Sequence, residues 1–175
     1  MNDYDFTLKY KLTGVALSQD ELVESLGACA CDDALIGLGV AGRIALAFTR
    51  AAQSAEAAMF SAIADVQRAI PTAELIEAAP DFVGLSDIAD VVGVSRQYMR
   101  KLMLTHGNSF PAPVHEGSAS VWHLAEVLCW LQARGAYAVA ATVLEVAGTA
   151  MQINLANQAK HIQPRMRRAF AALSA

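Results

Sequence analysis

The sequence predicts an α+β fold, in which an N-terminal βαββαβ unit of the ferredoxin-like type precedes a mainly helical second half. Two sequence patterns and the composition indicate this class. Polar and apolar residues alternate at the start of the chain, and apolar residues later recur at intervals of three and four. The chain has 175 residues, of which 55% are hydrophobic and 17% are charged. Such a chain can bury a large core, so we expect one full domain or two small ones.

The first strand and the first helix of the ferredoxin-like unit, which we expect over residues 1–79, follow from local patterns. Residues 6–12 alternate apolar and polar side chains, the period of a strand with one buried face. Ser18 and Glu21 have the spacing of a capping box, in which each side chain satisfies a free backbone N–H at the start of a helix. We expect the apolar stripe of this helix at Leu22, Val23 and Leu26.

A hairpin, a second helix and a last strand complete the unit. Two apolar segments, residues 34–38 and 43–49, are separated by glycines that can take positive φ. Ser54 can cap a helix that ends before Pro71, with apolar positions at Phe60, Ile63, Val66 and Ile70. Residues 73–78 predict the final strand. The order βαββαβ is that of an antiparallel sheet with two helices on one face.

The stretch LSDIADVVGVSRQYMRKLML, from Leu85 to Leu104, meets the steric demands of a helix-turn-helix. A small residue, Ala89, stands where the second helix crosses the first, and Gly93 can adopt the left-handed conformation that the turn requires. We expect Ser86 and Ser95 to cap the first and the second helix. The positions where the two helices face each other are apolar: Ile88, Val92, Val94, Met99 and Leu102.

The outer face of the second helix carries polar side chains that suit DNA. They are Ser95, Arg96, Gln97, Arg100 and Lys101. Arginine can bridge O6 and N7 of guanine, glutamine can pair with adenine, and serine or lysine can hold phosphates. The free N–H groups at the helix start add affinity for anions. We therefore expect double-stranded DNA as a partner; the alternative is a packing motif that has no DNA partner.

The residues that follow, FPAPVHEGSASVWHLAEVLCWLQARG, predict a wing and a further helix. Residues 114–115 and 120–122 are expected to pair across a turn at residues 116–118. In the next helix, four apolar residues are expected to face the core: Leu124, Val127, Leu128 and Leu131. Together with the helix-turn-helix, these elements predict a winged helix-turn-helix domain over residues 80–135.

This segment resembles the AlpA-like and excisionase-like winged helix-turn-helix regulators, a branch of the MerR-like group. The resemblance covers residues 85–134. It rests on VSR at 94–96, FPAPV at 110–114, VW at 121–122, and the EV and WL pairs within 126–131. It implies that residues 95–101 enter the major groove and that the wing, including His115 and Ser118, touches the DNA backbone. Wings of that family usually carry Arg or Lys, whereas HEGSAS offers only His115 and contains Glu116.

Charge is distributed unevenly along the chain. Residues 1–80 contain 5 Lys and Arg against 11 Asp and Glu, residues 81–150 contain 4 against 6, and residues 151–175 contain 4 against none, for a net charge of −4. A net acidic chain does not attract DNA as a whole, so binding must come from local basic patches. One such patch is the basic tail expected over residues 164–175, which is either a solvated end or an auxiliary phosphate-binding arm.

A long C-terminal helix is expected over residues 136–163, between the winged domain and the basic tail. Its apolar residues surround the whole helix, so each side must be covered by other protein. DNA-binding regulators commonly place two modules on adjacent half-sites, and two modules need a joint. We therefore expect a homodimer with this helix as a principal contact. The alternative is that the helix folds back between the two domains.

The sequence disfavours secreted and membrane proteins. The segment MNDYDFTLKYKL lacks the basic and apolar regions of a signal peptide, and no stretch reaches the roughly 20 strongly apolar residues of a membrane span. Three cysteines are too few for a disulfide framework and fit a reducing compartment. We therefore expect a cytoplasmic protein with no membrane partner.

Motifs for metal binding and catalysis are not found in the sequence. The four histidines lack metal-ligand spacing, so surface or capping positions are expected for His106, His115, His123 and His161. The GLGVAG run at 37–42 lies in the predicted hairpin and lacks a Walker lysine. Cys29 and Cys31 are one residue apart and are expected to be structural, pointing to opposite faces. We expect no metal, no cofactor and no catalytic residue.

These observations favour a cytoplasmic, sequence-specific DNA-binding protein that acts as a prokaryotic transcriptional regulator. The first alternative is a protein-interaction adaptor or antitoxin-like partner, whose winged domain binds protein. An enzyme built on the ferredoxin-like half is the weaker alternative, because no nucleophile with an evident base is present in the sequence. A ligand or a protein partner of the N-terminal domain stays an open alternative.

Overall fold

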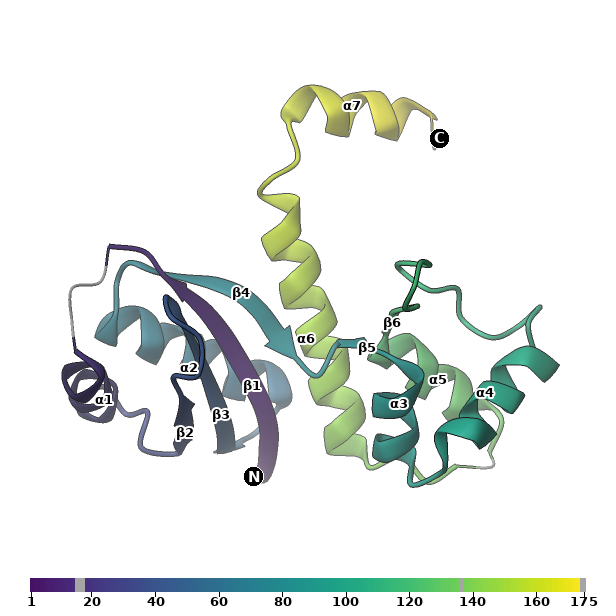
Figure 1. The fold of residues 1–175 in the computed structure, drawn as a ribbon, viewed down its shortest axis with the longest axis horizontal. Helices are drawn as coiled ribbons and strands as arrows, with labels where there is room; N and C mark the ends of the chain where they lie inside the picture. Colours follow the sequence, from purple (N-terminus) through teal and green to yellow (C-terminus); the bar gives the residue numbers. More distant parts are fainter. Residues whose placement is uncertain (15–17, 136, 174–175) are drawn as a thin grey trace.

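The computed structural model describes residues 1–14, 18–135 and 137–173. Within these residues it combines a four-stranded antiparallel sheet, a two-stranded pairing and seven helices (Figure 1). The first six elements are β1 (Asn2–Leu12), α1 (Gln19–Ala28), β2 (Ala34–Gly37), β3 (Arg43–Ala52), α2 (Ala55–Ala69) and β4 (Ala73–Ala79). The others are β5 (Phe82–Val83), α3 (Leu85–Val92), α4 (Arg96–Thr105), β6 (Trp122–His123), α5 (Leu124–Ala133), α6 (Ala141–Ala159) and α7 (Pro164–Leu173).

The sheet contains the first four strands in the spatial order β2-β3-β1-β4, and every neighbouring pair is antiparallel. The element order βαββαβ agrees with the expected order. β1 begins earlier than the predicted strand of residues 6–12, because its first residue, Asn2, already pairs with Ala52 of β3. The alternation along β1 buries one face of the strand, with Tyr4, Phe6, Leu8 and Tyr10 in the core.

Helices α1 and α2 share this core with the sheet and start at the predicted caps. Ser18 Oγ accepts from the Glu21 N–H at 3.3 Å, and Glu21 Oε2 accepts from the Ser18 N–H at 2.7 Å, which completes the capping box. The hydrogen bonds from the backbone and side chain of Ser18 lower the pKa of the Glu21 carboxyl. Ser54 Oγ caps α2 by accepting from the Ala57 N–H at 3.1 Å.

Two predicted core positions on these helices are exposed instead. Val23 of α1 is 44% exposed and Phe60 of α2 is 52% exposed. α2 approaches the sheet through small side chains, because Ala58 and Ala62 are fully buried. A contact made through alanines brings the helix axis close to the sheet and leaves Phe60 outside it. The apolar stripe predicted for α2 is therefore wrong at Phe60, and that of α1 is wrong at Val23.

The buried face of β1 contains a polar atom, the Tyr10 hydroxyl oxygen, that has no partner among the described residues. Tyr10 is 1% exposed, and within the described residues its hydroxyl makes no hydrogen bond, so burial raises the pKa of this phenol. An unpaired buried polar group costs about 1–3 kcal/mol, so Tyr10→Phe is expected to raise the free energy of unfolding by about 1 kcal/mol in urea titrations. Tyr4→Phe is the matched control, because the Tyr4 hydroxyl donates to Glu145 Oε2 at 2.9 Å and its removal is expected to destabilise. Equal losses in both variants would contradict the prediction.

Helix α6 lies between the sheet and the helical half of the molecule, residues 82–134 (Figure 1). Val146, Ala150 and Ile153 belong to the core of the sheet. Ala147 is buried in the core of the helical half, and Met151 packs against that core. Two neighbouring faces of α6 are thus covered within one chain, as the alternative to a dimer contact predicts. The homodimer stays a prediction, but these buried faces of α6 are already occupied.

Asparagines of α6 also cover the open edge of the sheet. β4 is an edge strand, whose outward N–H and C=O groups need partners that are not another strand. Asn154 Oδ1 accepts from the Ala78 N–H, and Asn154 Nδ2 donates to the Ala78 carbonyl, both at 2.8 Å. Asn157 Nδ2 donates to the Leu75 carbonyl at 2.8 Å. The side chains of α6 therefore take the place of a fifth strand.

The C-terminal segment differs in detail from the prediction. The long helix expected over residues 136–163 is α6, which ends at Ala159, and the basic tail expected over residues 164–175 is helical as α7 up to Leu173. Residues 136 and 174–175 lie outside the described residues. Arg167 Nη2 donates to the Ala159 carbonyl at 3.1 Å, which fixes the corner between the two helices.

The glycine run and the two cysteines that were considered for chemistry lie between paired strands and at the end of α1. The glycine run 37–42 joins the paired strands β2 and β3, and Gly42 takes φ of 73° in that turn. Cys31 is buried, which raises its pKa to about 11, whereas Cys29 is half-buried, and both are free thiols. In the described ranges, no three His, Cys, Asp or Glu side chains gather as they would around a metal ion. None of the helices in these ranges combines the length and the apolar character needed to cross a bilayer.

Candidate nucleic-acid interface

Helices α3 and α4 meet at a left-handed glycine. Gly93 has φ of 75° and ψ of 34°, and its N–H donates to the Ala89 carbonyl. Residues with a side chain rarely adopt this conformation, so the role predicted for Gly93 is confirmed. Ile88 and Ala89 of α3 and Met99 of α4 are buried where the helices cross, and Leu102 packs against the same core.

The predicted cap of α4 is present, and that of α3 is not. Ser95 Oγ accepts from the Tyr98 N–H at 3.1 Å at the start of α4. α3 begins directly after its N-cap Gly84, so Ser86 lies inside the first turn and its predicted capping role is wrong. Asp87 Oδ2 instead accepts from the Gly84 N–H at 2.8 Å. A carboxylate one turn into the helix therefore replaces the serine cap.

The outer face of α4 carries cations that have no partner within the described residues. The side chains of Arg96, Gln97, Arg100 and Lys101 are exposed, and none makes an ion pair or hydrogen bond with another described residue. The helix contains three basic residues and no acidic residue. Its positive charge is therefore not neutralised by the chain and is available to an anion.

Two adjoining surfaces bring the predicted residues together. The first is a depression along α4, which is lined by Gln97, Arg100, Lys101, Leu104 and Thr105. The second is a groove of about 470 Å³ between the helices and the segment predicted as the wing, residues 114–122, to which Arg96, Arg100 and Ser118 contribute. Arg100 belongs to both, so the two surfaces form one continuous face. Asp87 also lines the groove, so one carboxylate partly offsets its two guanidinium groups.

The wing is anchored by aromatic packing. Trp122 is buried and its Nε1 donates to the Pro111 carbonyl at 3.0 Å. The Phe110 ring lies edge-on to two tryptophans. Its centroid is 6.1 Å from that of Trp122 and 5.1 Å from that of Trp130. The short strands β5 and β6 pair below it, with Val83 opposite Trp122. The wing segment therefore starts and ends at fixed points, which sets where its turn lies relative to α4.

Of the two predicted wing residues, the structure brings only Ser118 to the cations of α4. His115 pairs with Val121 across the wing turn, as the sequence predicts. Its ring folds over the turn, because a Cβ built on Gly117 would lie 2.7 Å from His115 Nε2. His115 and the neighbouring Glu116 are both exposed, and no described contact joins His115 to α4.

Two clusters that fix the position of α4 were not foreseen. The Tyr98 and Tyr137 hydroxyls form a hydrogen bond of 2.9 Å, which raises the pKa of Tyr137 and ties α4 to the segment before α6. At the other end of α4, His106 is the C-cap, which confirms a capping position for this histidine. Arg134 Nη2 lies 3.0 Å from His106 Nε2 and its guanidinium stacks 4.6 Å from the Trp130 ring centroid.

A buried polar network next to this interface also escaped prediction. His123 occupies the N-cap position of α5, but its ring is buried and makes no cap, so the predicted surface or capping role is wrong. His123 Nδ1 lies 2.7 Å from Asp81 Oδ1, and Asp81 Oδ2 accepts from Asn154 Nδ2 at 2.8 Å. These partners are 42 and 73 residues apart in the sequence, so no local spacing could reveal them.

Comparisons of the chain with protein-family models, with curated proteins and with solved structures found no match.

Proposed function

We propose that this chain is a sequence-specific DNA-binding protein, a transcriptional regulator that combines a ferredoxin-like domain with a winged helix-turn-helix domain of the AlpA-like and excisionase-like kind. The observation that carries the proposal is the exposed face of α4. It presents Arg96, Gln97, Arg100 and Lys101 without partners in the described chain, next to Ser118 of the wing. An α-helix fits the major groove, where each base pair shows a distinct pattern of donors and acceptors.

Each side chain of this face has a role in the proposal. Arg96 and Gln97 lie in the first turn of α4, where the recognition helices of helix-turn-helix proteins contact base edges. Arg100 stands one turn further along and borders both surfaces, so it can reach either a base or a phosphate. Lys101 and Ser118 are suited to phosphates, and the Ser95 hydroxyl can donate to a phosphate while its oxygen caps the helix.

Electrostatics support a local rather than a global attraction. The chain has a net charge of −4, whereas α4 carries three positive charges and no negative charge. Asp87 in the groove and Glu116 on the wing reduce the field next to the helix. We therefore expect affinity that depends strongly on salt, with most phosphate contacts made by α4 and few made by the wing.

Base reading by the first turn of α4 is tested with alanine variants. The cognate site is first selected with the full chain from a pool of random double-stranded DNA. Arg96→Ala and Gln97→Ala are then expected to lower affinity for that site by about 1–3 kcal/mol each and to relax the preference at one base pair. Lys101→Ala is expected to weaken binding to all sequences alike and to reduce the salt slope by about 1.

Arg43→Ala is the control for loss of one exposed cation, because Arg43 lies at the start of β3 on the sheet half. It is expected to leave affinity and preference unchanged. If Arg96→Ala weakened cognate and random DNA equally, base reading by Arg96 would be excluded. If the selection enriched no sequence and random DNA did not bind, the proposal of DNA binding would fall.

Exposed apolar residues favour the second candidate function, in which the same half binds a protein as an adaptor or antitoxin-like partner. Leu104 on α4 is 66% exposed and Val114 at the wing is 47% exposed. Such side chains are typical of a protein interface rather than of a phosphate contact. Leu104→Ser separates the two functions, because it is expected to leave DNA affinity within about twofold and to disrupt a protein complex.

A further inference from the structure

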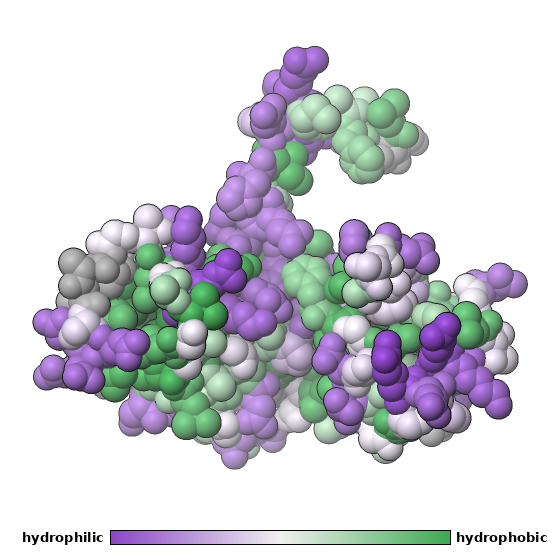
Figure 2. Space-filling model, viewed as in Figure 1, coloured by the Kyte–Doolittle hydropathy of each residue, from purple (hydrophilic) through white to green (hydrophobic). Residues whose placement is uncertain are grey.

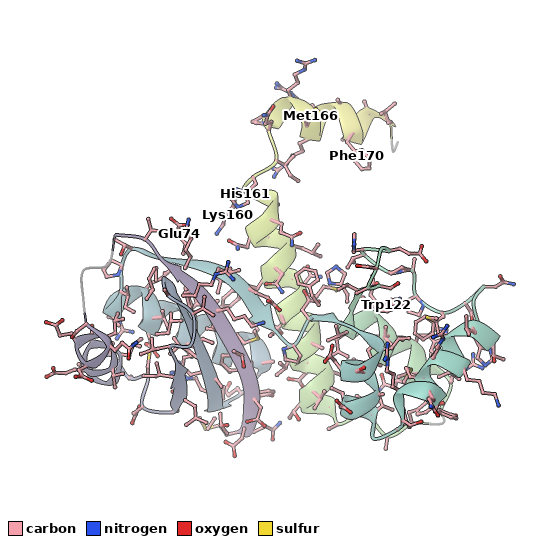
Figure 3. The ribbon with its side chains drawn as sticks, in the orientation of Figure 1. Glu74, Trp122, Lys160, His161, Met166 and Phe170 are labelled. Atoms are coloured by element: carbon pink, nitrogen blue, oxygen red, sulfur yellow. The ribbon has the colours of Figure 1, made fainter. Side chains whose placement is uncertain are left out.

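A long groove lies on the sheet half of the molecule, away from the α4 face. It has a volume of about 1150 Å³ and is lined by α2, β4 and α6. Its apolar lining includes Ile63, Leu75 and Ile153, and its polar lining includes three carboxylates, Glu56, Glu74 and Glu145. Figure 3 shows Glu74 near Lys160 and His161, which line one end of the groove. The groove is therefore an apolar channel with a mainly acidic border.

Phe60 is the large apolar side chain of this groove that the packing of α2 on the sheet leaves outside the core. It lines the groove and is 52% exposed, although the helical period of α2 predicts it in the core. A large aromatic side chain that is half-exposed beside a concave apolar surface is typical of a binding site for another apolar element.

Helix α7 has the apolar stripe that such a groove accepts. Met166, Phe170 and Leu173 follow the spacing i, i+4, i+7 and are 58%, 70% and 85% exposed. No described residue of α7 is buried. Figure 2 shows hydrophobic residues gathered on α7, which projects from the end of α6. Helix-in-groove contacts use anchors at this spacing.

Helix α7 is short enough to fit the groove and is opposite to its border in charge. A helix rises 1.5 Å per residue, so the ten residues of α7 are about 15 Å long, while the part of α6 that lines the groove, from Leu144 to Asn157, extends over about 20 Å. α7 contains three arginines and no acidic residue. Arg165 flanks the apolar stripe and can face the acidic border of the groove.

The turn between α6 and α7 determines whether α7 can reach the groove of its own chain. Arg167 Nη2 donates to the Ala159 carbonyl at 3.1 Å, and the Arg167 N–H donates to the Gln163 carbonyl at 3.1 Å. These bonds hold α7 in the direction seen in Figure 1, where it turns away from the end of α6, and no described residue of α7 lines the groove of its own chain. A second copy of the chain presents an equivalent groove to this projecting helix.

We propose that α7 of one chain docks in the groove between α2, β4 and α6 of a second chain, and that the exchange is reciprocal. The apolar stripe of α7 then packs on Phe60, and Arg165 lies at the acidic border. A reciprocal exchange gives a closed twofold dimer and leaves no groove open for further chains. This contact replaces the buried faces of α6 as the joint of the predicted homodimer, and it does not involve the α4 face.

Light scattering on the free protein tests this proposal without DNA, so its outcome is separate from that of the proposed function. The wild-type chain is expected to show twice its mass of 18.5 kDa at micromolar concentration. Phe60→Glu, and Met166→Glu combined with Leu173→Glu, are each expected to weaken self-association by about tenfold or more. All three residues are exposed, so circular dichroism is expected to stay that of the wild type. Val40→Glu, at an exposed apolar residue outside the groove, is the control and is expected to stay dimeric.

Disulfide trapping identifies the chain that supplies α7. In a background with Cys29→Ser and Cys129→Ser, a Phe60→Cys chain is mixed with a Met166→Cys chain under oxidising conditions. A cross-linked species of twice the chain mass is expected in the mixture, and much less with Val40→Cys in place of Phe60→Cys. A wild-type monomer, a dimer unaffected by all these variants, or cross-linking only within a Phe60→Cys, Met166→Cys double variant would overturn the proposal. It would also be overturned if the α7 variants lowered DNA affinity without changing the mass, since α7 would then be a phosphate-binding arm.

Discussion

Replacing Arg50 by methionine is expected to lower the free energy of unfolding by about 3 kcal/mol, because Asp33 loses its ion-pair partner and the buried Asp65 keeps only the exposed Arg68. All five N–H groups of this guanidinium are used. Nε and Nη2 donate to the two oxygens of Asp33 at 2.7 and 2.9 Å, and Nη1 donates to Asp65 Oδ2 at 2.7 Å. Nη1 also donates to Ser61 Oγ and Nη2 to the Ala30 carbonyl. The Arg50 side chain is 11% exposed and that of Asp65 is 12% exposed, so water can replace few of these contacts.

Urea unfolding, followed by two spectroscopic signals, measures this loss of stability and shows whether it extends to both halves of the molecule. Circular dichroism follows the secondary structure of both halves, whereas the two tryptophans, Trp122 and Trp130, both belong to the helical half. Because α6 is part of both cores, the midpoint of tryptophan fluorescence is expected to fall together with the midpoint of circular dichroism. A fluorescence midpoint that stayed at the wild-type value would contradict coupling of the two halves through α6.

Arg43→Met is the matched control for the Arg50 substitution. Arg43 lies on the same strand, is exposed, and makes no ion pair with a described residue. Its replacement is expected to change stability by no more than about 0.5 kcal/mol. If Asp33→Asn and Asp65→Asn are added to Arg50→Met, part of the lost stability is expected to return, because the charges that Arg50 neutralised are then absent. A similar loss in Arg43→Met and Arg50→Met would show that the buried contacts of Arg50 contribute no more to stability than an exposed arginine does.

Features that depend on neighbours within four residues were predictable from the sequence. The cap bonds from Ser18, Ser54 and Ser95 each join a side chain to a backbone N–H three residues later. Gly93 shows the left-handed φ that the turn between α3 and α4 demands. Such geometry is set by local backbone sterics and hydrogen bonding, so the residue types carry the information directly.

Features that depend on distant partners were not predictable. The pairing of Asp81 with His123 and with Asn154 joins positions that no helical or strand period relates. The exposure of Phe60 depends on the closeness with which alanines let α2 approach the sheet, and the course of α6 depends on two cores forming around it. An apolar pattern shows that one face of an element will be buried, but it does not show which other element buries it.

The candidate interface shows the same division. Helical period places Arg96, Gln97, Arg100 and Lys101 on the outer face of α4, and all four are exposed there. The approach of Ser118 to the groove follows from the order of the wing elements, whereas the folding of the His115 ring over Gly117 depends on the turn itself. Their contacts with DNA stay a prediction for the variants of α4 and the wing to test.

Asn154→Leu is expected to lower the free energy of unfolding by roughly 3 kcal/mol or more, since it removes three hydrogen bonds from the buried contact between α6 and the rest of the chain. Asn154 is 2% exposed. Leucine is similar in volume but leaves the N–H and carbonyl of Ala78 and one oxygen of Asp81 without this partner. Each buried group left unpaired costs about 1–3 kcal/mol. The loss is measured by urea unfolding of the full chain.

A graded series on the same helix separates these hydrogen bonds from helix propensity. Gln158→Leu changes an exposed position and is expected to be neutral within about 0.5 kcal/mol. Asn157→Leu removes one bond, to the Leu75 carbonyl, and is expected to cost about 1 kcal/mol. Asn154→Leu should cost the most, because it uncovers both backbone groups of Ala78 at the sheet edge. Equal effects at the three positions would mean that the edge of β4 finds other partners when α6 withdraws its amides, and that α6 is held by its apolar contacts alone.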